Sequence, residues 1–141
     1  MAAFSKFNQF VEDMAEKVHN LGADTLKIML TNTAPVATNS VKADLTEIAA
    51  QNGYSAGGTA VTITASAQTS GTYKLTGNDV VFTASGGSFG PARYAVLYND
   101  TPTSPADPLI GFWDRGSSVT PADGETLTID LDQAAGILTV A

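Results

Sequence analysis

The stretch Arg93-Tyr-Ala-Val-Leu-Tyr-Asn99 carries the strongest fold signal in the sequence. Both of its faces are apolar, because the alternating residues are Tyr94, Val96 and Tyr98 on one side and Ala95 and Leu97 on the other. A strand that is apolar on both sides is typical of the middle of a sheet that is covered on both faces. We therefore expect this segment at the centre of the core.

Shorter segments on both sides of this stretch also show the two-residue alternation of a strand. The predicted strands are residues 26–31, 59–67, 73–76, 80–84, 109–114, 126–132 and 137–140. Turn residues such as Gly, Pro, Asn and Asp separate them about every ten residues. The pattern predicts a mainly β fold, a β-sandwich or jelly roll of about 7–9 short antiparallel strands.

One helical signal precedes these strands. Apolar residues recur three and four positions apart, at Phe4, Phe7, Val11, Met14, Val18 and Leu21, with Phe10 beside them. Gly22 is typical of the residue that ends a helix. We expect one amphipathic α-helix within residues 1–24 and a β-sandwich over residues 25–141, which together have the length of a single domain. The apolar stripe either folds back on this sandwich or packs against a neighbouring subunit.

The charge balance argues against nucleic acid as a partner. Fourteen acidic and seven basic residues give the 141-residue chain a net charge of −7, the wrong sign for a surface that follows phosphates. No apolar run approaches the roughly 18 residues of a membrane span, and the start lacks the pattern of a cleaved leader. We therefore expect a soluble protein with no membrane partner. With no cysteine, the chain has neither disulfides nor a nucleophilic thiol.

The charges are unevenly distributed along the chain. Between residues 51 and 91 only Lys74 and Asp79 are charged, whereas residues 100–132 hold seven carboxylates and one arginine. Strand edges without Lys or Glu tend to stick to other strands. The uncharged segment is therefore either a solvated face rich in threonine or a surface covered by a neighbouring subunit.

The sequence offers little chemistry for an enzyme. His19 is the only histidine, and its expected place near a helix end is explained by the helix dipole. Asp130 and Asp132 share one strand face and could gather Ca²⁺ with Asp123 or Glu125, but no calcium-loop motif is present. The glycine-rich segments match no phosphate-binding motif and are interpreted as turns. We predict no catalytic residues, no metal and no cofactor.

Trp113 is the aromatic residue of greatest interest for binding. Phe112 and Trp113 are adjacent in a predicted strand, so their side chains point to opposite faces and one of them lies outside the core. Trp113 with Arg115 fits either a subunit interface or a platform on which a sugar stacks.

Three segments resemble small virion proteins encoded among the structural genes of tailed bacteriophages. They are residues 10–32, residues 93–102 with Pro108-Leu-Ile-Gly111, and Asn52-Gly-Tyr-Ser-Ala-Gly-Gly58. The resemblance covers most of the chain and implies a β-sandwich capsid decoration, or cement, protein. Such proteins sit on the outside of the head as dimers or trimers and bridge capsomers. The family offers no catalytic residue to carry over.

The functional expectation is a structural protein that binds itself, as a homodimer or homotrimer, and the major capsid protein. The chain would be made in the host cytoplasm and end on the capsid surface of the virion. Phe4, Phe7 and Phe10 are the candidate docking residues of the helix. Deletion of residues 1–22 is then expected to abolish assembly while much of the β fold persists. The alternative is a tail or head appendage module that binds host glycans through Trp113 or Tyr98.

Overall fold

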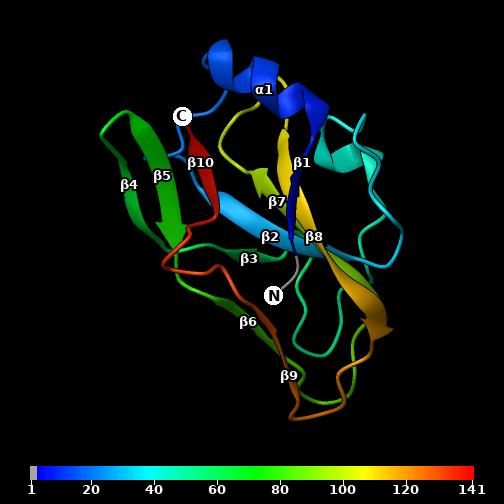
Figure 1. Ribbon diagram of the computed structural model, residues 1–141. Coiled ribbons are helices and arrows are strands. Elements are labelled where there is room, and N and C mark those ends of the chain that lie inside the picture. The colour runs from blue at the N-terminus through cyan, green and yellow to red at the C-terminus, as the bar shows by residue number, and fades with distance from the viewer. Residues whose placement is uncertain (1–2) are drawn as a thin grey trace.

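The computed structural model describes residues 3–141, which fold mainly into antiparallel β-strands (Figure 1). The main sheet has the order β1-β8-β7-β2-β3, with bounds Phe4–Lys6, Leu109–Val119, Ala92–Asn99, Leu26–Thr31 and Thr59–Ala60. A second sheet has the order β10-β5-β4, with bounds Leu138–Val140, Thr72–Gly77 and Ile63–Thr69. A ribbon pairs β6, Val80–Thr83, with β9, Thr126–Ile129. The predicted mainly β fold with one N-terminal helix is confirmed.

Strand β7 lies at the centre of the main sheet, as the sequence predicts. It is paired with β2 along one edge and with β8 along the other. All of its side chains except that of Arg93 are buried. The two alternating sets of β7 therefore enter two different apolar cores, one on each face of the sheet.

The larger core, which we call the sheet-to-sheet core, lies between the main sheet and the two smaller sheets. Strand β2 contributes Leu26, Ile28 and Leu30, while Leu75 of β5 and Phe82 of β6 meet them from the opposite layer. Each of these residues is at most 4% exposed. The packing gives the molecule a sandwich-like arrangement of two layers.

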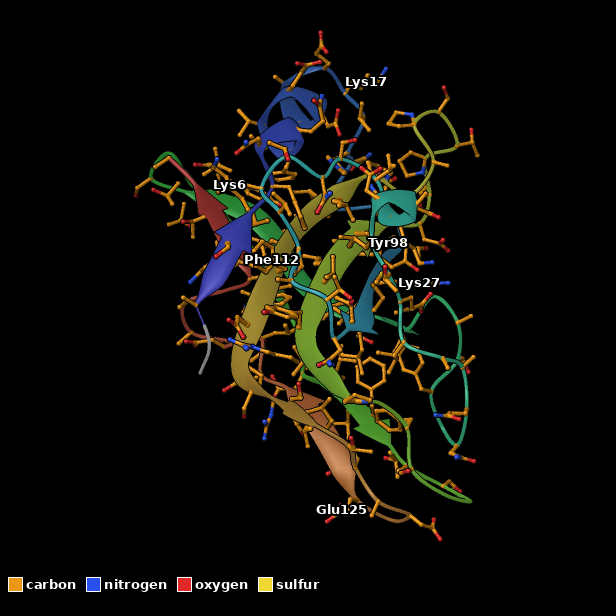
Figure 2. The ribbon with its side chains drawn as sticks, turned by 90° about the vertical axis from the view of Figure 1, so that its right-hand side faces the viewer. Lys6, Lys17, Lys27, Tyr98, Phe112 and Glu125 are labelled. Atoms are coloured by element: carbon orange, nitrogen blue, oxygen red, sulfur yellow. The ribbon has the colours of Figure 1, made fainter. Side chains whose placement is uncertain are left out.

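The smaller core, which we call the loop-covered core, lies on the other face of the main sheet. Its buried residues are Phe7, Met29, Val96, Tyr98 and Leu109. The long loop after β2 passes in front of this face near Tyr98 (Figure 2). The Tyr98 hydroxyl donates to the Gly57 carbonyl at 2.6 Å, and this bond ties the loop to the sheet.

The N-terminal helix is shorter than predicted. Helix α1 comprises only Asn8–Ala15, and the residues Phe4–Lys6 before it form strand β1, which pairs with β8. Phe7 is the residue that precedes the helix, and Lys17 adopts a left-handed conformation with φ of 68° soon after its end. The three-residue spacing of Phe4 and Phe7 suggested a helix, but pairing with the edge of the main sheet places Phe4 on a strand instead. The expected stop at Gly22 is therefore also wrong.

The predicted strand over residues 59–67 is divided between two sheets. Strand β3 pairs with β2 of the main sheet, and β4 pairs with β5 of the second sheet. Between them, the Val61 amide donates to the Leu26 carbonyl and the Val61 side chain is buried. The chain thus crosses from one layer to the other while keeping an extended alternation, which is why the sequence showed a single strand. Residues Lys42–Asp44 form the short 3-10 helix η1.

Candidate functional site

The three N-terminal phenylalanines lie in different places. Phe7 is 0% exposed in the loop-covered core, with its ring centroid 5.2 Å from that of Phe112. Phe10, on α1, is buried in the sheet-to-sheet core at 5.3 Å from the His19 ring. Phe4 is half-buried on β1 and packs at 5.0 Å from Trp113. The apolar stripe therefore folds back on the chain's own domain, and Phe7 and Phe10 have no surface to offer a partner.

Phe4 reaches Trp113 because the residue beneath it is glycine. A Cβ atom on Gly111 would lie 2.2 Å from the Phe4 ring. The absence of a side chain there leaves room for the Phe4 ring beside Trp113, at an interplanar angle of 57°. Phe4 and Trp113, two separate candidates in the sequence, are brought together by the pairing of β1 with β8.

Trp113 lines an open cleft of about 450 Å³ between β7, β8 and β9, which we call the Trp113 cleft. Its apolar wall is formed by Trp113, Leu30, Ala95, Leu127 and Ile129, and its polar wall includes Arg93, Asp114, Arg115 and Asp130. Trp113 itself is only 7% exposed, so the indole is mostly core and presents little of its surface to the cleft. Trp113 and Arg115, which the sequence paired as an interface or sugar platform, both line this cleft.

The polar wall of the Trp113 cleft is held by an ion pair that the sequence gave no reason to expect. Arg93 donates from Nε to Asp114 Oδ1 at 2.8 Å and from a terminal nitrogen to Oδ2 at 3.1 Å. The guanidinium lowers the pKa of the Asp114 carboxyl, which also accepts the Gly116 amide at 2.8 Å. Arg115 is turned to its own loop, donating to the Ser117 carbonyl at 3.2 Å. Arg93 is therefore already occupied, and Arg115 is held by a neutral acceptor.

His19 lies beyond the helix in a buried polar cluster and not at a helix terminus. Its Nδ1 is 3.0 Å from the Asn99 side-chain nitrogen, which also donates to Asp24 at 2.7 Å. Because the Asn99 oxygen accepts the Thr101 amide, the Asn99 nitrogen is the donor and His19 Nδ1 the acceptor. The neutral ring then carries its proton on Nε2. Neither His19 Nε2 nor Asp13 Oδ2 has a hydrogen-bond partner, and both atoms are buried.

The environment of His19 disfavours its charged form. The imidazole is 8% exposed, and burial lowers its pKa, against the opposing attraction of Asp13 and Asp24. The cluster joins the end of β7, through Asn99, to the segment between α1 and β2. The cluster has no local signal in the sequence, because His19 and Asn99 are 80 residues apart. The helix dipole does not explain the position of His19, since α1 ends at Ala15.

The acidic residues considered for calcium are used in local turns. Asp132 accepts the Ala134 and Ala135 amides at 3.1 Å each, Asp130 accepts the Asp132 amide at 2.9 Å, and Asp123 accepts the Gly86 amide at 3.0 Å. Across residues 3–141, no group of three or more His, Asp or Glu side chains is placed to hold a metal ion.

The exposed edge of the second sheet is the other surface of interest. Strand β4 lies at the left margin of the molecule in Figure 1, with β5 on one side and no strand on the other. Apart from half-buried Ile63, all its residues are exposed, and none is charged. This strand belongs to the segment of residues 51–91 with few charges. The sequence allowed two interpretations of that segment, a solvated face or a surface covered by a neighbouring subunit.

Comparison with protein-family models, with curated proteins and with solved structures gives no match to this chain. Among the helices of residues 3–141, none has the length and apolar character needed to cross a bilayer. Two surfaces of the described chain are candidates for binding, the Trp113 cleft and the open edge of β4.

Proposed function

We propose that this protein is a non-enzymatic structural protein of a tailed-bacteriophage virion. It is a capsid decoration protein that associates with copies of itself, binds the major capsid protein on the outside of the head and stabilises contacts between capsomers. It is made in the host cytoplasm and joins the virion surface. One observation carries the proposal: β4 is a long, exposed and uncharged strand with an open edge.

The charge of the chain explains why such an edge favours assembly. Two copies that each carry a net charge of −7 repel one another across most of their surfaces. An uncharged strand offers contact without that repulsion and without the desolvation of charged groups. On a symmetric shell, many weak contacts of this kind add up to strong attachment. The resemblance to small virion proteins supports the same role.

Binding to shells tests this proposal. Purified protein is mixed with shells assembled from the major capsid protein of the phage that encodes it, and the mixture is sedimented and imaged by cryo-microscopy. We expect the chain to co-sediment, to saturate at a fixed ratio to capsomers and to appear as density on the outer surface. A chain that stays in the supernatant at all concentrations would contradict the proposal.

A glycan-binding appendage is the second candidate, because the Trp113 cleft combines an apolar wall with the polar groups of Arg93, Asp114, Arg115 and Asp130. Binding to a glycan array, weakened in Arg115→Ala, would favour it if the chain has no affinity for shells. Arg115 is exposed, so this substitution leaves the core intact, whereas Trp113→Ala would also open a cavity. Wild-type binding that Arg115→Ala and Asp130→Ala leave unchanged would place any glycan elsewhere.

A further inference from the structure

Six strands of the described chain lie at the ends of sheets, and β4 differs from the other five. The others are β1, β3, β6, β9 and β10, and they have two to four residues each. Strand β4 has seven residues. Short edge strands are one of the ways in which proteins prevent unwanted pairing, and the length of β4 removes that protection.

Strand β4 also lacks two other protective devices, charged side chains and proline. The sequence Ile63-Thr-Ala-Ser-Ala-Gln-Thr69 has no proline and no charge. A bulge interrupts its pairing with β5 between Ile63 and Ala65, but the five residues from Ala65 to Thr69 pair in regular register. Alternate residues of an antiparallel strand direct their backbone groups to opposite sides, so this regular segment presents unpaired N–H and C=O groups to its open side.

The cation on the neighbouring strand β5 does not block this edge. Lys74 of β5 lies opposite Ala67 and so shares its face of the sheet. Its ammonium group donates to the Ala134 carbonyl at 2.9 Å, which holds the charge toward β10, the strand on the far side of β5 from β4. Ala65, Ala67 and Thr69 share this face of β4, and their side chains are small and exposed.

We propose that β4 is the contact between two copies of this chain, in which β4 pairs antiparallel with β4 of a second copy across a two-fold axis. The proposal rests on the proposed function and names the surface through which the chain binds itself. A second copy is favoured over another partner because an antiparallel edge is complementary to itself under two-fold symmetry. The absence of charge also removes the repulsion that two acidic chains meet elsewhere.

This geometry predicts a dimer and not a trimer, since a two-fold strand pairing closes after two copies. The joined sheets would form one six-stranded sheet with the order β10-β5-β4-β4-β5-β10. One strand edge buries less than the roughly 1,600 Å² of a standard stable interface, so the dimer is expected to dissociate on dilution.

Lysine substitutions on β4 test the pairing. In Ala65→Lys/Ala67→Lys, like charges come to face one another across the two-fold axis. We expect the dissociation constant of the dimer to rise at least tenfold, measured by sedimentation equilibrium. The matched control is Ala49→Lys/Ala50→Lys, which adds the same charge at two exposed alanines in the loop after η1. Both variants lower the net negative charge equally, so only direct contact at β4 explains a loss confined to the first.

Crosslinking supplies a second readout that does not depend on repulsion. The chain has no cysteine, so a variant with one introduced cysteine has a single reactive thiol. We expect Ala65→Cys, Ala67→Cys or Thr69→Cys to give a disulfide-linked dimer on mild oxidation, because residues near the axis of an antiparallel pair come within disulfide distance. The control Ala50→Cys is expected to remain monomeric on a denaturing gel.

The outcomes separate this inference from the proposed function. If the wild type dimerises but the β4 lysine variant dimerises equally well and no β4 cysteine crosslinks, the β4 contact is refuted and self-association through another surface stands. If the wild type is monomeric at every concentration and does not bind shells, the proposed function itself fails. Circular dichroism of each variant confirms that a lost dimer is not a lost fold.

Discussion

Replacement of Phe7 by alanine tests whether the N-terminal segment is part of the domain or a detachable arm. Phe7 joins strand β1 to helix α1, and its ring is 0% exposed in the loop-covered core. Its amide donates to the Ile110 carbonyl at 3.1 Å, so backbone and side chain are both engaged with β8. The structure therefore leads to the opposite of the sequence-based expectation for deletion of residues 1–22: the β fold should not persist without them.

The size of the effect follows from complete burial. Truncation of a fully buried phenylalanine to alanine costs about 3–5 kcal/mol, from lost transfer free energy and the cavity left behind. A domain of this size has a free energy of unfolding of about 5–15 kcal/mol, so Phe7→Ala removes a large part of it. The control is Val11→Ala on α1, where the side chain is 47% exposed and the expected change is within about 0.5 kcal/mol.

Urea titration followed by circular dichroism measures both changes. The midpoint of unfolding should fall clearly in Phe7→Ala and stay near the wild-type value in Val11→Ala, with similar slopes in both. Equal midpoints for the two variants would show that the segment is attached loosely. The same result would restore the interpretation of Phe7 as a docking residue.

Three further predictions concern single residues. In the wild type, the pKa of His19 is lower in the folded than in the unfolded state, so the unfolded state binds more protons once the pH falls below about 6.5, and the free energy of unfolding decreases. His19→Gln should abolish this decrease, and urea titrations of both proteins at pH 7 and 5 check it. Gly58→Ala should lower the free energy of unfolding by about 3 kcal/mol or more, since φ is +79° and a Cβ would lie 1.9 Å from a carbonyl oxygen of β2. The control Gly71→Ala, with open space around the Cβ, should lower it by about 1 kcal/mol in the same assay. Glu47→Leu should lower the thermal midpoint by an amount that corresponds to about 1–3 kcal/mol, because the carboxylate accepts the Tyr54 hydroxyl and the Gly57 amide at 2.6 Å each; an unchanged midpoint would show that these bonds add nothing.

The central strand could be predicted because burial on both faces leaves a direct mark in the sequence. Leu97 and Tyr98 are adjacent and both apolar, and the structure places them in different cores. The alternation of Leu26, Ile28 and Leu30 likewise identified a strand whose facing residues enter the sheet-to-sheet core. Local alternation was sufficient in these segments because each residue's face depends only on its parity along the strand.

The N-terminal segment could not be predicted in full, because residues far away in the chain decide whether Phe4–Lys6 form a helix or a strand. Phe4 pairs with Trp113 on β8, and no local sequence pattern indicates that contact. For the same reason the Arg93–Asp114 ion pair and the contact of Asn99 with His19 were missed. In contrast, the open edge of β4 had a signal in the sequence, the long uncharged segment, although the sequence did not show which strand would be left unpaired.

Both proposals require that the chain assembles with copies of itself. Sedimentation velocity of the wild-type 141-residue chain over a range from micromolar to several hundred micromolar measures this directly. We expect a concentration-dependent shift from the 14.5 kDa monomer toward twice that mass. A single species at 14.5 kDa over the whole range would contradict it.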